Sequence, residues 1–150
     1  MTRRDKKLIL IAMYLITMGF GGAKAADWTP ENKAQSARLD DAWKRVYFVE
    51  SSNGTNPDVF VENHRRALGA AQITPIVVRD VNLIVKRELY ELKDRLNTLY
   101  SRHMFNIYCM HYYPNGSVQQ MCRLWYRGPN KKRQWDKHSD EYWSMCVAVK

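Results

Sequence analysis

Glu50 is the residue in this sequence whose type and surroundings best suit acid–base chemistry. It follows the bulky run Tyr47–Val49 and precedes the turn-forming run Ser51–Gly54. A carboxyl group held against an apolar surface loses hydration, and this loss raises its pKa. A carboxyl group with a raised pKa keeps its proton near neutral pH, as a general acid must. Glu50 is therefore the candidate catalytic acid.

Several further motifs follow Glu50 in a fixed order. After Glu50-Ser51 come ALGAAQITP at residues 67–75, LWYRGP at residues 124–129 and Tyr142-Trp143. This order resembles the lytic transglycosylase and goose-type lysozyme superfamily, with its E-S pair, G-x-x-Q segment, aromatic-N-x-G segment and late tyrosine. A closer resemblance is to the transglycosylase-like proteins of bacteria and phages, which have E-S-x-N, G-x-x-Q-I, W-N-G-G-P and Y-W. It extends over about residues 40–147.

The resemblance implies a lysozyme-like helical fold with long loops at a catalytic cleft, and a lytic transglycosylase acting on peptidoglycan glycan strands. Glu50 would be the single acid and then the base, and the products would end in 1,6-anhydro sugars. The resemblance also implies roles for five other residues. Ser51 would support the loop and the carboxylate, and Gln72 would bind a sugar or its N-acetyl group. Trp125 and Tyr126 would line the cleft, and Tyr142 would approach Glu50.

The sequence departs from this pattern at Tyr126 and Arg127, where the family has asparagine and glycine. Tyr126 offers no amide, and Arg127 brings a positive charge that either binds a wall carboxylate or lowers the pKa of Glu50. One alternative is therefore a catalytically weakened peptidoglycan-binding protein of the same fold. Another is a lysozyme-type hydrolase, which needs a second carboxylate about 5–9.5 Å from the first. Asp58 and Glu62 are the candidates for that carboxylate.

Helices are the elements expected to position these residues. Apolar residues recur at three- and four-residue spacing between Pro30 and Glu50, which predicts a helix ending at Glu50. Capping and stop signals predict four more helices, from Thr74-Pro75, from Asn97 or Thr98 to Tyr112, from Ser117 to Gly128-Pro129, and from Ser139 onward. The helix after Thr74 is expected to bury Val77, Val81, Ile84 and Val85. Residues 58–61 are the one short β candidate, so the fold class is mostly α.

Residues 1–25 have the order of a secretory signal peptide. Basic residues between Arg3 and Lys7 precede the apolar run Leu8–Phe20, and Ala23–Ala25 supplies an A-x-A cleavage site. The apolar run is shorter than the roughly 20 residues that cross a bilayer. We therefore expect cleavage after Ala25 and membrane contact through the signal only, with an uncleaved anchor helix as the alternative. Residues 26–150 are then expected to form a periplasmic or extracellular lysozyme-like domain, and we expect it to be a monomer.

The chain is basic, with a formal net charge of +9. A basic domain favours anionic polymers, and export favours wall glycans over nucleic acid. A third alternative is a basic protein that acts on membranes or nucleic acid without enzymatic activity. The short basic runs Arg65-Arg66 and Lys131–Arg133 are more typical of solvated loops than of such binding patches. Peptidoglycan is therefore the expected partner, and nucleic acid is not.

Three cysteines, Cys109, Cys122 and Cys146, are present. An exported domain meets an oxidising compartment, so one disulfide with one remaining thiol is expected, and the spacing selects no pairing. The cysteines and histidines match no zinc-site spacing, so we expect no metal and no cofactor.

Overall fold

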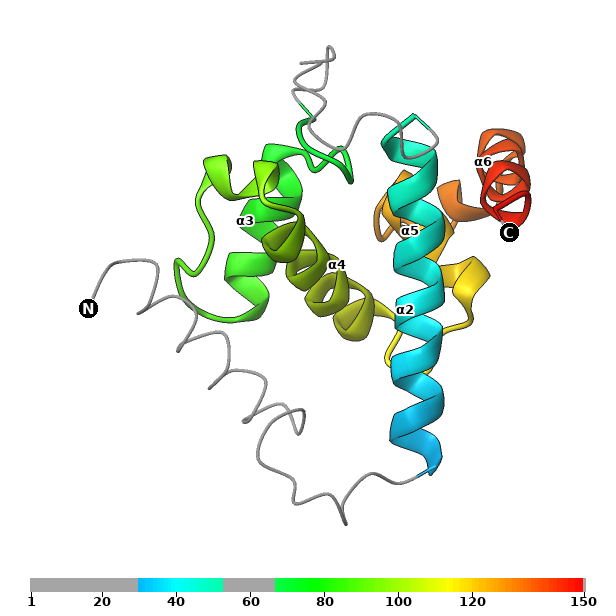
Figure 1. Cartoon of the computed structure of the whole chain (residues 1–150), viewed down its shortest axis with the longest axis horizontal. Helices are drawn as coiled ribbons and strands as arrows, with labels where there is room; N and C mark the ends of the chain where they lie inside the picture. The colour runs from blue at the N-terminus through cyan, green and yellow to red at the C-terminus, as the bar shows by residue number, and fades with distance from the viewer. Residues whose placement is uncertain (1–29, 53–66, 150) are drawn as a thin grey trace. The chain divides into compact units, whose positions relative to one another are not determined.

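The computed structural model describes residues 30–52 and 67–149. The helices are α2 (Pro30–Glu50), α3 (Pro75–Ile84), α4 (Thr98–Tyr112), α5 (Val118–Arg127) and α6 (Lys137–Val147), with short 3-10 turns η2 (Leu92–Leu96) and η3 (Arg133–Trp135) (Figure 1). Within the described ranges, β pairing is confined to one isolated bridge between Leu68 and Ile73. The predicted mostly α fold is confirmed.

Several expectations fall on residues outside the described ranges. They are the signal peptide at 1–25, the β candidate at 58–61, and the carboxylates Asp58 and Glu62. Contacts divide the chain after Ser36, and the site lies in the second unit, Ala37–Lys150. None of the helices in the described ranges has the length and apolar character needed to cross a membrane.

Three helix starts lie where the sequence predicts them, because one side chain caps each start. Thr74, Asn97 and Ser117 accept hydrogen bonds from the free backbone N–H groups of the first turns of α3, α4 and α5. Pro75 takes the first position of α3, where a proline costs no hydrogen bond. The predicted ends at Glu50, Tyr112 and Gly128 are likewise confirmed.

Two predictions about the helices were wrong in part. The last helix begins at Lys137, because Asp136 and not Ser139 is its N-cap. On α3, Val81 and Val85 are buried as predicted, whereas Val77 and Ile84 are only partly buried and Val78 takes the inner position. The buried side of this segment therefore includes Val78, Val81 and Val85, and only part of the expected face was right.

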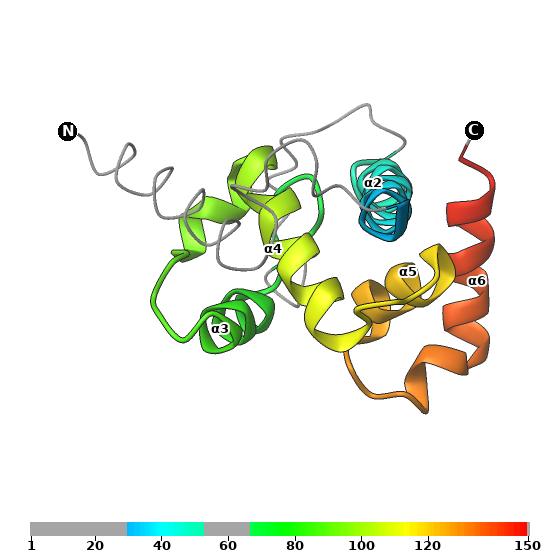
Figure 2. The same ribbon diagram turned by 90° about the horizontal axis from the view of Figure 1, so that it is seen from below.

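Aromatic side chains join the helices around the site. Trp43 of α2 lies against Phe105 of α4 with ring centroids 5.6 Å apart, and Phe105 lies 5.1 Å from Trp125 of α5. Phe105 is completely buried, and rings of this size contribute strongly to core stability. Helix α3 packs on α4, and α5 lies between α4 and α6 (Figure 2). The rings of Trp43, Phe105 and Trp125 thus link α2, α4 and α5 in one core.

Cys109, Cys122 and Cys146 are fully buried and free. The disulfide expected from export is therefore not formed in the structure. The three thiols act as small apolar core side chains, and burial raises the pKa of Cys109 well above its usual value.

Candidate active site

A cleft of about 740 Å³ is lined by the end of α2, the start of α3, the middle of α4 and the end of α5. Four of the predicted site residues line it together: Glu50, Gln72, Trp125 and Tyr126. Its volume is in the range of clefts that hold small ligands. Ser51 and Tyr142 are placed behind this surface and are fully or almost fully buried.

Glu50 is the last residue of α2, and its side chain is partly buried at the wall of the cleft. Burial raises the pKa of Glu50 from 4.5 to about 7, and a hydrogen bond from Tyr142 opposes this rise. The Tyr142 hydroxyl donates to Glu50 Oε1 at 2.9 Å. With this pKa the carboxyl group is about half protonated near neutral pH while it lines the cleft, which suits a group that must both give and take a proton.

Tyr142 and Ser51 both lie near Glu50, and Tyr142 donates a hydrogen bond to its carboxyl group. Tyr142 of α6 stacks on Tyr126 of α5, with centroids 4.5 Å apart and ring planes at 8°. The Ser51 hydroxyl donates to the Tyr47 carbonyl at 2.5 Å, at the end of α2. Tyr142 is therefore placed to hold the acid, whereas the hydroxyl of Ser51 stabilises the end of the helix that carries it.

Gln72 lies in a tight turn, and its side chain also lines the cleft. Two backbone hydrogen bonds close the turn: Leu68 N donates to the Ile73 carbonyl at 3.1 Å, and Ile73 N donates to the Leu68 carbonyl at 2.9 Å. Within the turn, Gln72 N donates to the Gly69 carbonyl at 2.9 Å. The side-chain Nε2 of Gln72 also donates to the Gly69 carbonyl, at 3.1 Å. Gln72 therefore stabilises the turn through its amide nitrogen and forms part of the cleft wall.

Trp125 has both a core contact and a cleft contact. Its indole Nε1 donates to the Ala71 carbonyl at 3.0 Å, and its ring lies against Phe105 and Tyr108. The hydrogen bond ties α5 to the turn that holds Gln72. Trp125 thus positions one wall of the cleft relative to the other.

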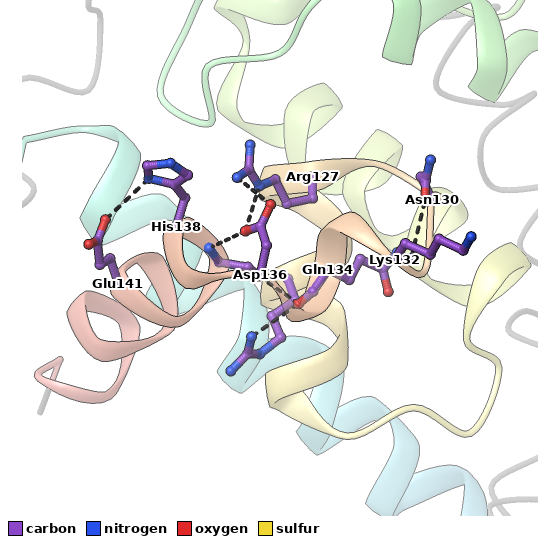
Figure 3. Close-up of polar contacts among 9 residues, drawn as sticks. Arg127, Asn130, Lys132, Gln134, Asp136, His138 and Glu141 are labelled. Atoms are coloured by element: carbon purple, nitrogen blue, oxygen red, sulfur yellow. Dashed lines mark hydrogen bonds and ion pairs between the residues drawn. The ribbon is translucent and has the colours of Figure 1, made fainter.

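Arg127 is engaged by Asp136. Its Nη2 lies 2.6 Å from Asp136 Oδ2 and its Nε 3.2 Å from Oδ1, a two-point contact (Figure 3). The guanidinium also lies 4.9 Å from the centroid of the Tyr126 ring. The pKa of Glu50 is nevertheless raised to about 7, because burial of its carboxyl outweighs the lowering effect of the Tyr142 hydrogen bond.

Asp80 of α3 is a cleft residue that the sequence interpretation missed. It lies three residues after Val77 and four after Ile76, which also line the cleft, so helical spacing places all three on one side of α3. The sequence pattern alone does not indicate Asp80, because the partner of this side of α3 is set by tertiary packing. Tyr108 of α4 was also missed as a wall residue.

Glu50 is expected to make the folded chain less stable as the pH rises. Its folded pKa of about 7 exceeds the ordinary 4.5, so folding favours the protonated form. This contribution is fully present below pH 4.5 and is lost as the pH rises to about 7, a change on the order of 3 kcal/mol. Since glutamine does not titrate, the Glu50→Gln variant should be more stable than the wild type at pH 8, with a gap that closes toward pH 4.5. Urea unfolding across this range tests the expectation, and stability curves that stay parallel would contradict it.

The described residues thus combine a carboxyl group with a raised pKa, a tyrosine that donates a hydrogen bond to it, and a cleft with aromatic, amide and carboxylate walls. No cluster of three metal-binding side chains occurs in residues 30–52 and 67–149. No protein-family model matches the chain, nor does any curated protein or solved structure.

Proposed function

We propose that this chain is an exported lytic transglycosylase of lysozyme-like fold that cleaves peptidoglycan glycan strands. The observation that carries the proposal is Glu50, a partly buried carboxyl with a pKa raised to about 7 at the wall of a cleft. The order of the E-S, G-x-x-Q and Y-W motifs supports the same activity. The signal-like residues 1–25 and the basic charge support export and an anionic wall substrate.

In the proposed reaction Glu50 acts twice. Its proton passes to the glycosidic oxygen as the bond from that oxygen to the sugar C1 breaks. The Glu50 carboxylate then takes the proton of the C6 hydroxyl of the same sugar, and the C6 oxygen bonds to C1. The product is a 1,6-anhydro sugar, and Glu50 ends with its proton restored. The Tyr142 hydroxyl, 2.9 Å from Oε1, stabilises the carboxylate between the two transfers.

The substrate class is tested by comparing polymers. We expect the purified protein to release soluble fragments from isolated peptidoglycan and none from cellulose, whose sugars lack the N-acetyl and peptide groups of the wall. Release is measured by chromatography and mass spectrometry of the supernatant. A folded protein that sediments with peptidoglycan without releasing fragments would contradict the proposal and favour a binding protein.

A lysozyme-type hydrolase is the second candidate, and Asp80 is the observation that favours it. Asp80 and Glu50 line the same cleft, and hydrolytic glycosidases use two carboxylates across the scissile bond. The transglycosylase proposal gives Asp80 no proton to transfer. Asp80→Asn should therefore keep its rate of fragment release within about threefold of the wild type, whereas loss of a hydrolase's second carboxylate should cost roughly a hundredfold or more. A loss of that size, with folding intact, would favour the hydrolase.

A further inference from the structure

Asp136 connects the end of α5, which lines the cleft, to the start of α6. As the N-cap of α6, its Oδ1 accepts from Ser139 N at 2.9 Å. The same carboxylate binds Arg127, the last residue of α5, through two hydrogen bonds (Figure 3). The guanidinium holds the pKa of Asp136 below its usual value, so the pair is fully ionised near neutral pH.

A continuous series of contacts leads from this ion pair to Glu50. The Arg127 guanidinium lies 4.9 Å from the Tyr126 ring, and Tyr126 stacks on Tyr142 at 4.5 Å. Tyr142 in turn donates its hydrogen bond to Glu50. Tyr126 and Arg127 are the two residues that depart from the W-N-G-G-P pattern. They contact each other, and Arg127 binds Asp136, so the three residues form one cluster.

The charges around Glu50 make the state of Arg127 important. Tyr142 of α6 contacts Glu50 directly, and the other titratable or charged residues that line the same cleft are Tyr108 of α4, Asp80 of α3, and Tyr126 and Arg127 of α5. Among the described residues that line the cleft, Arg127 is the one cation. An unpaired guanidinium there would favour the ionised form of a nearby carboxyl, whereas a guanidinium bound to a carboxylate forms a neutral pair whose field falls off quickly.

We propose that Asp136 is a positioning residue for the candidate acid, because it holds Arg127 against Tyr126 and screens the charge of Arg127 from Glu50. The inference deepens the proposed function, and it rests on that function only for its effect on the cleavage rate. If the Asp136–Arg127 ion pair served packing alone, removing either partner would break the same contact and should change the pKa of Glu50 in the same direction. The screening role instead predicts opposite effects for the two removals.

The test is a titration of Glu50 by NMR in protein labelled at the glutamate side-chain carbons, with Glu50→Gln used to assign the signal. Asp136→Asn removes the charge but keeps a good N-cap for α6. It should lower the midpoint of Glu50 by roughly 0.5 pH units, because Arg127 is then unpaired. Arg127→Gln leaves Asp136 as an unpaired anion and should raise that midpoint. The double variant should fall between the two.

Shifts of opposite sign support the proposal. Shifts of the same sign, or no shift in either variant, overturn it in favour of an ion pair that serves packing alone. If Asp136→Asn fails to fold, Asp136→Ser replaces it, since serine is also a good N-cap without charge. The titration needs no cleavage activity. Opposite shifts in an inactive protein would therefore support the screening role of Asp136 and contradict the proposed function. An active protein without these shifts would support the proposed function and contradict the screening role.

Discussion

Replacement of Glu50 by glutamine is expected to slow the release of peptidoglycan fragments by roughly a hundredfold to ten-thousandfold. Glutamine fills nearly the same volume and still accepts the hydrogen bond that Tyr142 donates at 2.9 Å. It has no acidic proton for the glycosidic oxygen and cannot take one back from the C6 hydroxyl. The variant should therefore bind peptidoglycan normally, which cosedimentation would measure beside the release assay.

Glu141→Gln is the matched control for this variant. Glu141 is an exposed residue on α6 that pairs with Lys137 and His138, away from the cleft walls. The same chemical change there should leave the release rate unchanged, since exposed pairs of this kind contribute little. If Glu50→Gln kept most of its activity while folded, Glu50 would not be the acid.

Gly69→Ala should lower the free energy of unfolding by roughly 4 kcal/mol. Gly69 has a φ of +78°, where a side chain is strained, and a Cβ built on it would lie 1.9 Å from the Arg95 carbonyl oxygen. That carbonyl cannot move freely, because it accepts a hydrogen bond from Ser101 at 2.9 Å. The turn that holds Gln72 must therefore shift, and urea unfolding measures the loss.

Gly128→Ala is the control that separates the two causes of the stability loss expected in Gly69→Ala, which are backbone strain and the close contact with Arg95. Gly128 also has a positive φ, +73°, but a Cβ there would come no closer than 3.9 Å to Tyr108 Oη. Only the backbone cost of about 1–3 kcal/mol applies. Equal losses in the two variants would mean that the contact with Arg95 is relieved easily, and would contradict the expected rigidity of the turn.

Helix ends could be predicted where one side chain decides them, as at Thr74, Asn97 and Ser117. The start of α6 could not, because Asp136 and Ser139 are both good N-cap types, and the choice also involves the contact between Asp136 and Arg127. The 3-10 turns η2 and η3 were missed because short turns of this kind carry little periodic signal.

In the candidate site, too, features set by sequence motifs could be predicted, and features set by tertiary packing could not. Motif order was enough to predict that Glu50 and Gln72 would share a cleft, and that Tyr142 would approach Glu50. Their roles in catalysis stay predictions. The effect of Arg127 was left open, because its partner Asp136 is chosen by the geometry of the chain between α5 and α6. Asp80 was missed because only the packing of α3 brings it to the cleft that Glu50 also lines.

The most direct measurement is digestion of peptidoglycan by the wild-type protein in water labelled with ¹⁸O, followed by mass spectrometry of the soluble fragments. Transfer to the C6 hydroxyl predicts fragments with 1,6-anhydro ends, each lighter by one water than the hydrolysed form and free of ¹⁸O. Fragments with reducing ends that carry ¹⁸O would contradict this chemistry and establish hydrolysis with water as the nucleophile.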